Sequence, residues 1–160
     1  MERKKMLTDA VREAARRSVL CWLATVDERG HPNVSPKEIW TIADDQHVVL
    51  ANIASPMSAR NIADQPLVCL SFVDVLAQKG YKLQGRAHEL LPDADGFAAW
   101  AAPLKTMVGE RFLIRSVFVI AVDSVQPIVA PSYRFYPEET TEASQRQSAM
   151  RVYGLKPVNE

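Results

Sequence analysis

The sequence predicts a mostly β fold with flanking helices, in the form of a small, mostly antiparallel barrel. About six segments have the apolar runs or the polar and apolar alternation of strands, and turn residues such as those at 27–30 separate them. The helical patterns lie outside this run of strands and do not alternate with it, which argues against a parallel βαβ sheet. The sequence contains no GxGxxG or GxxxxGK[ST] motif, so it indicates neither a dinucleotide-binding fold nor a P-loop.

The first third of the chain predicts one helix followed by three strands. Residues 6–17 repeat apolar side chains at helical spacing with Arg and Glu between them, which is typical of an amphipathic helix. An apolar run over 18–26, turn residues at 27–30 and an extended segment from Asn33 predict a β-hairpin. A strand over 47–52 follows a turn that contains two aspartates, so the three strands are expected to form a meander.

The next elements are marked by proline. Pro36 lies inside an extended segment, and because proline cannot donate to a sheet ladder it indicates an edge strand or a bulge. Ser55 and Pro56 predict a helix start, with Ser55 as the N-cap, and Gln65-Pro66 ends that helix. Further strands are expected over 67–73, 81–88 and 112–122, and further helices over 92–108 and 141–153.

Length, charge and apolar patterning limit the classes of protein to which the chain can belong. The 160 residues are 48% hydrophobic and predict a single domain over 1–160, with a C-terminal tail and helix at about 131–160. Lysine plus arginine equals aspartate plus glutamate at 19 each, which argues against nucleic acid as a partner. No apolar stretch approaches the ~18 residues of a membrane span. Cys21 and Cys69 lie in apolar runs without a disulfide or metal motif, so we expect buried thiols and a cytoplasmic protein.

Two segments could bind an anion. Ser35 and Lys37 flank Pro36 on one face of their strand and offer a hydroxyl and a cation. If Ser55 caps the following helix, the first-turn N–H groups, Ser58 and Arg60 together outline a phosphate site. The three histidines lack metal-ligand spacing, so no metal site is expected.

Three blocks of sequence then resemble a known family. They are DERGHPNVSPKE at 27–38, ANIASPMSARNI at 51–62 and SFVDVLAQKGYKLQG at 71–85. In this order they resemble the pyridoxamine 5′-phosphate oxidase-like flavoproteins, which are FMN-binding split barrels, over about residues 18–91. The oxidase has a C-terminal Arg-Leu-His-Asp-Arg segment that recognises pyridoxal phosphate, whereas this chain ends RVYGLKPVNE. The resemblance is therefore to a flavin-nucleotide-binding branch and not to the true oxidase.

The resemblance implies a homodimer with FMN at the subunit interface. It places two residues along the flavin and ribityl side, namely Ser35 and Lys37. It places four at the phosphate, namely Ser55, Ser58, Arg60 and Asn61. It places the backbone of Ala51 and Asn52 along the isoalloxazine ring, with three further side chains near the polar edge of that ring: Gln78, Lys79 and Lys82.

The resemblance implies an FMN-dependent oxidoreductase that acts on an unidentified small molecule. One alternative is a non-enzymatic protein that stores flavin or senses redox state. Another is a haem binder on the same fold, which needs an axial ligand, and His31, His47 and His88 are the histidines that could supply it.

Overall fold

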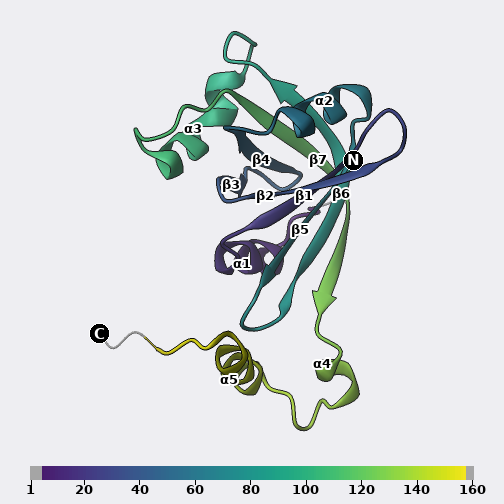
Figure 1. The fold of residues 1–160 in the computed structure, drawn as a ribbon, viewed down its shortest axis with the longest axis vertical. Coiled ribbons are helices and arrows are strands. Elements are labelled where there is room, and N and C mark those ends of the chain that lie inside the picture. Colours follow the sequence, from purple (N-terminus) through teal and green to yellow (C-terminus); the bar gives the residue numbers. More distant parts are fainter. Residues whose placement is uncertain (1–4, 158–160) are drawn as a thin grey trace.

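The computed structural model describes residues 5–157, and in this part of the chain seven strands form one antiparallel sheet flanked by five helices (Figure 1). The strands are β1 (Cys21–Val26), β2 (Pro32–Lys37), β3 (Trp40–Ile42), β4 (His47–Asn52), β5 (Leu67–Asp74), β6 (Lys79–Leu90) and β7 (Ser116–Val129). The helices are α1 (Asp9–Arg17), α2 (Pro56–Asp64), α3 (Phe97–Val108), α4 (Ser132–Phe135) and α5 (Glu142–Tyr153). The predicted class, a mostly β split barrel with flanking helices, is confirmed.

The strands follow the order β2-β1-β5-β6-β7-β4-β3 across the sheet. The long strands β6 and β7 pair over almost their whole length, with a bulge between Gln84 and Gly85. A Cβ atom at Gly85 would overlap the carbonyl oxygen of Ala121, so the close approach of the two strands at the bulge requires glycine. This long pair joins the β2-β1-β5 part of the sheet to the β4-β3 part.

The predicted meander of the first three strands is wrong. β1 and β2 form the expected hairpin, but β4 pairs with β3 on one side and with β7 on the other. Val48, Val49 and Leu50 are all fully buried, so both faces of β4 are covered, which fits its place inside the sheet between β3 and β7.

The predicted edge strand is confirmed. β2 is the outermost strand on its side of the sheet, and Pro36 lies opposite Trp22 of β1. Proline is tolerated at this position because β2 has a neighbouring strand on one side only.

Several other elements begin or end a few residues away from their predicted positions. α1 begins at Asp9 and not at residue 6, although Leu7 ahead of it is fully buried. α3 begins only at Phe97 because Gly96 has a positive φ of 83°. The last long strand starts at Ser116 and runs on to Val129, and α5 has the predicted position with Thr141 as its N-cap.

The helices cover the barrel at different places. α1 packs on β5 and β6 through Val11, α2 lies over β1 and β6, and α3 lies over β4 and β7. β7 leads out of the sheet to α4, and α5 lies beyond that end of the barrel (Figure 1). Within residues 5–157 no helix is long and apolar enough to cross a bilayer.

The two cysteines differ in burial. Cys21 is fully buried in the core, as expected, whereas Cys69 is only partly covered. Burial raises the pKa of both thiols, so both are neutral at physiological pH.

Candidate functional site

The polar face of β2 forms one wall of the candidate site. Residues directly opposite each other in a sheet point to the same face, and Lys37, Ser35 and Asn33 lie opposite Cys21, Leu23 and Thr25 of β1. These three β1 residues are buried, so the alternation of β2 carries an amide, a hydroxyl and an ammonium group toward the inside of the barrel.

Helix α2 closes over this wall. The Ser35 hydroxyl lies 3.2 Å from the Ser58 hydroxyl, and the Lys37 ammonium donates to Ser55 Oγ. Ser58 is buried, while Ser35 and Ser55 are half-buried. We refer to Ser35, Lys37, Ser55 and Ser58 as the hydroxyl–ammonium cluster. The structure thus brings together four residues that the sequence placed in two separate segments.

Lys37 has an unusual electrostatic environment. Its residue is only 6% exposed, and among residues 5–157 no carboxylate forms an ion pair with it. Burial lowers the pKa of its ammonium below the usual range, although nearby Cys21 acts weakly in the opposite direction. A buried cation without a counter-ion is costly, so an anion beside Lys37 would be strongly favoured.

The start of α2 differs in one respect from the prediction. The helix begins at Pro56 as expected, but Ser55 does not cap it with its side chain. The backbone of Ser55, at φ −128° and ψ 61°, is outside the extended geometry of an N-cap, and its hydroxyl accepts from Lys37. The predicted side-chain cap is therefore wrong, and the first turn of α2 has no capping side chain within the described chain.

Asn52 ties α2 to the sheet. Its Oδ1 accepts from the Ser55 backbone N–H at 3.0 Å, and its Nδ2 donates to Ser116 Oγ at 2.9 Å and to Glu89 Oε1 at 3.2 Å. The Ser116 hydroxyl also donates to Glu89. Sequence reasoning selected Asn52 but missed Glu89 and Ser116, because nothing in their local pattern marks them. Ala51, beside Asn52, is buried, and its N–H donates to the Ile39 carbonyl at 2.9 Å.

Asn61 and Arg60 point to different surroundings. Asn61 is buried, and its Nδ2 donates to Thr25 Oγ1 at 3.0 Å. Arg60 is exposed and lines a cavity of about 430 Å³ between α2 and the β1–β2 turn, which it shares with Asp27 and Asp64. Arg60 therefore lies outside the hydroxyl–ammonium cluster and near acidic side chains.

The three residues expected at the polar edge of the flavin lie elsewhere in this chain. Gln78 and Lys79 are at the β5–β6 turn, where Gln78 has a φ of 53° and Lys79 lies 4.2 Å from the Tyr133 ring centroid. Across the sheet, Lys37 lies three strands from Tyr81 of β6, through Cys21 and Phe72, which is about 14 Å, and Lys79 lies two residues beyond Tyr81. Lys82 lies opposite Ser71 on the outer face of the sheet. Within one chain, none of the three reaches the hydroxyl–ammonium cluster.

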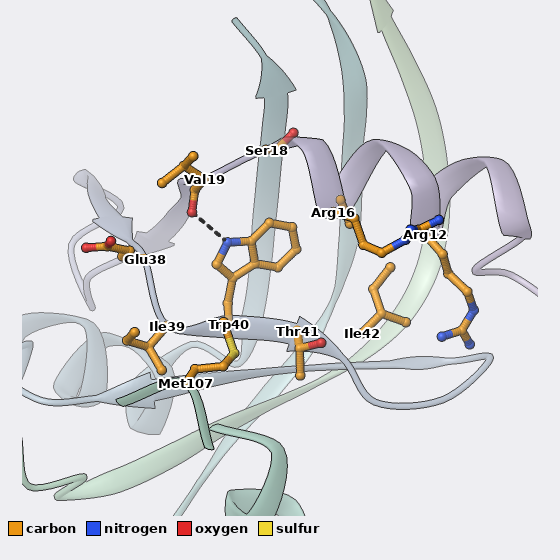
Figure 2. A pocket seen from close by; sticks show the side chains of 11 residues that line it. Arg12, Arg16, Ser18, Val19, Glu38, Ile39, Trp40, Thr41, Ile42 and Met107 are labelled. Carbon is orange, nitrogen blue, oxygen red and sulfur yellow. Dashed lines mark hydrogen bonds between the residues drawn. The ribbon is translucent and has the colours of Figure 1, made fainter. Parts of the chain in front are cut away.

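Another cavity of the described chain is lined by none of the predicted site residues. Its volume is about 590 Å³, and α1, β3 and the end of α3 surround it (Figure 2). Trp40 lies in its wall and is 5% exposed, with its indole ring 5.0 Å from the Phe72 ring centroid and its indole N–H donating to the Val19 carbonyl at 3.4 Å.

Comparison with solved structures shows the same fold in proteins of low sequence identity. HupZ of Group A Streptococcus is 24% identical with a TM-score of 0.67, over 78% of this chain and 96% of that protein. An FMN-binding protein from Syntrophomonas wolfei is 14% identical with a TM-score of 0.64, over 76% and 85% of the two chains. HutZ, a haem storage protein from Vibrio cholerae, is 21% identical with a TM-score of 0.58, over 78% and 94%.

A comparison with curated protein sequences found no match. A family model described as pyridoxamine 5′-phosphate oxidase, in contrast, matches residues 7–145. That match spans most of the chain, including β1, β2, α2 and the rest of the sheet. The chain therefore belongs to the pyridoxamine 5′-phosphate oxidase family.

Proposed function

We propose that this protein binds FMN non-covalently at the hydroxyl–ammonium cluster and acts as an oxidoreductase on a small molecule. The observation that carries the proposal is Lys37, a buried ammonium group without a carboxylate partner among residues 5–157. The FMN phosphate would supply the missing negative charge. The Ser55 hydroxyl accepts from the ammonium, and the paired Ser35 and Ser58 hydroxyls come from the same strand and helix, so that all three can donate to a phosphate oxygen.

The start of α2 adds to this electrostatic field. The helix begins directly after Ser55, no side chain of residues 5–157 caps its first turn, and the positive end of its dipole faces the same region as Lys37. Asn61 donates to Thr25 of β1, and this bond helps to fix the position of α2 beside the cluster. Arg60 would act on the phosphate only from the outer side of α2.

The flavin ring would extend from the cluster along the backbone of Ala51 and Asn52. Asn52 is fixed by its bonds to Ser55, Ser116 and Glu89, which makes this edge a firm support. FMN, when bound, supplies hydride and single-electron chemistry, while the chain supplies position and charge. Lys79 and Lys82 are the cations we assign to the N1–O2 edge of the ring, where a positive charge favours the anionic reduced flavin.

Those two lysines require a second subunit. Because Lys79 contacts Tyr133 and Glu142 and lies three strands away from Lys37 in the same chain, we propose a homodimer in which one subunit holds the phosphate and the other supplies Gln78, Lys79 and Lys82. The sheet offers a surface for this contact. Trp22, Val34 and Leu67 are 45%, 57% and 56% exposed. Trp22 and Val34 alternate with the buried residues of the β1–β2 hairpin, so they lie on its outer face.

We expect light scattering after size-exclusion chromatography to give twice the 17.9 kDa of the chain. Trp22→Glu should shift the protein toward the monomer, because a charge would replace a large apolar contact. Val152→Glu, at a more exposed apolar side chain on α5, is the matched control and should leave the mass unchanged. A monomeric unmodified protein that still binds FMN tightly would contradict the dimer.

The absorbance spectrum of freshly purified protein tests the choice of cofactor. We expect the two visible bands of a flavin, released on denaturation as FMN. A Soret band would instead support haem binding, for which HutZ has a comparable fold. The histidines do not favour that alternative: His31 and His47 contact Asp27 and Asp44 in their own turns, and His88 projects from β6 to solvent.

A further inference from the structure

The cavity between α1, β3 and the end of α3 has a volume and a lining suited to a small ligand. Its volume of about 590 Å³ is in the usual range for small-molecule sites. Its inner wall is apolar: Ile39, Ile42 and the small exposed part of Trp40 lie on the sheet side, and Met107 comes from the end of α3 (Figure 2). The bond from the Trp40 indole to the Val19 carbonyl holds the flat ring in place.

The opposite wall is cationic. Arg12 and Arg16 lie one turn apart on α1, and both line the cavity. Arg12 also pairs with Asp45 at 2.9 Å, and Arg16 pairs with Glu13. Each pair uses one terminal nitrogen of a guanidinium that carries five N–H donors, so further donors remain for a ligand. Glu38 is the one acidic residue in the lining of this cavity.

The cavity also adjoins the strand edge to which we assign the flavin ring. Ile39 lines the cavity, and its carbonyl accepts from the Ala51 N–H at 2.9 Å. Two residues before Ile39 in the chain is Lys37 of the hydroxyl–ammonium cluster. A molecule in the cavity would therefore lie one strand away from the Ala51 backbone.

We propose that this cavity binds small organic anions that have a flat, apolar body, with the anionic group at Arg12 and Arg16 and the flat body against Trp40. We further infer that this class of molecule is the substrate that meets the flavin, a step that rests on the proposed function. The apolar wall supplies affinity through buried area, and the two arginines select a carboxylate over a neutral group of the same size.

The test uses 2-naphthoate and its neutral analogue 2-naphthamide, titrated into the full chain by calorimetry. We expect naphthoate to bind more tightly than naphthamide by about three- to tenfold, since Arg12 is partly exposed and Arg16 is exposed. The double variant Arg12→Gln/Arg16→Gln should lose this preference and keep naphthamide binding. Arg151→Gln on α5 removes an exposed arginine outside the cavity and should change nothing.

Binding is located by the indole N–H resonances of the three tryptophans. We expect naphthoate to shift the Trp40 signal, assigned with Trp40→Phe, and to leave those of Trp22 and Trp100 in place. An equal affinity for the two probes, or a preference that survives the double variant, would overturn the anion site. A shift confined to Trp22 or Trp100 would also overturn it.

The role as substrate site is tested separately. In the FMN-loaded protein, naphthoate should perturb the flavin absorbance, and the double variant should bind FMN as well as the unmodified protein does. An unchanged flavin spectrum during naphthoate binding would refute the neighbouring position. Lys37→Met should lose FMN and keep naphthoate. If the unmodified protein binds naphthoate with the arginine-dependent preference but binds no FMN, the proposed function fails and the anion site stands.

Discussion

Replacing Lys37 by Met should weaken FMN binding by roughly ten- to a hundredfold and leave riboflavin almost unaffected. The lost contact is a charge-assisted hydrogen bond to the phosphate, a class worth about 1.5–3 kcal/mol, and each 1.4 kcal/mol is a factor of ten. Met has a similar length and no charge, so it fills the same buried space, and the fold should be retained or slightly more stable. Fluorescence titration with both ligands measures the effect.

Two further variants test whether Lys37 is the cation that binds the phosphate. Lys156→Met removes an exposed lysine near the C-terminus and should bind FMN normally. Arg60→Ala tests the cation in the other cavity, and we expect it to lose less than Lys37→Met because Arg60 is exposed and lies near Asp27 and Asp64. The reverse order of losses would move the phosphate to Arg60. Equal losses for FMN and riboflavin would show that Lys37 supports the ring or the fold instead.

FMN affinity and the free energy of unfolding should both depend on pH through Lys37. Burial lowers the pKa of Lys37 in the free protein, and a bound phosphate would raise it again, so FMN binding takes up a proton as this pKa is passed. FMN affinity should therefore fall as pH rises from the lowered pKa toward the ordinary value of about 10.4. The free energy of unfolding of FMN-free protein should rise over the same window, because the unfolded chain keeps its proton longer. Lys37→Met should remove both effects.

Replacing Asn52 by Ala should lower the free energy of unfolding by about 2–4 kcal/mol. The substitution leaves the Ser55 N–H without its partner, which costs about 1–3 kcal/mol, and it removes one bond each from Ser116 and Glu89, which stay bonded to each other, at about 0.5–1.5 kcal/mol per lost bond. Urea unfolding of the FMN-free protein measures the loss. Asn33→Ala is the matched control: its amide makes one bond, to Thr25 at 3.3 Å, and is half-buried, so the loss should stay below about 1 kcal/mol.

Asn52→Ala should also weaken FMN, since Asn52 holds the residue that accepts from Lys37. Ser116→Ala should have a smaller effect on both stability and FMN affinity, because Asn52 keeps its bond to Ser55. Comparable stability losses for Asn52→Ala and Asn33→Ala would contradict the role of Asn52 as the link between β4, β6, β7 and α2.

Local chemistry explains the elements that sequence reasoning predicted. The β1–β2 hairpin follows from an apolar run, turn residues and a second extended segment, all within about 20 residues. The start of α2 follows from Pro56, and α5 from its capping box at Thr141. The meander was mispredicted because a strand such as β4 does not encode which strands it pairs with.

The candidate site was likewise predictable from the sequence only in part. The sequence by itself determined that Ser35 and Lys37 share one face of β2 and that Ser55 and Ser58 lie at the start of a helix, because strand alternation and helix starts depend on neighbouring residues. Only the tertiary structure decided that the start of α2 meets β2, so that Lys37 contacts Ser55 across 18 residues of chain. It also decided that Asn52 bonds to residues 37 and 64 positions away. Such contacts depend on how the whole sheet closes around its core, and this closure buries Lys37 away from any carboxylate of the described chain.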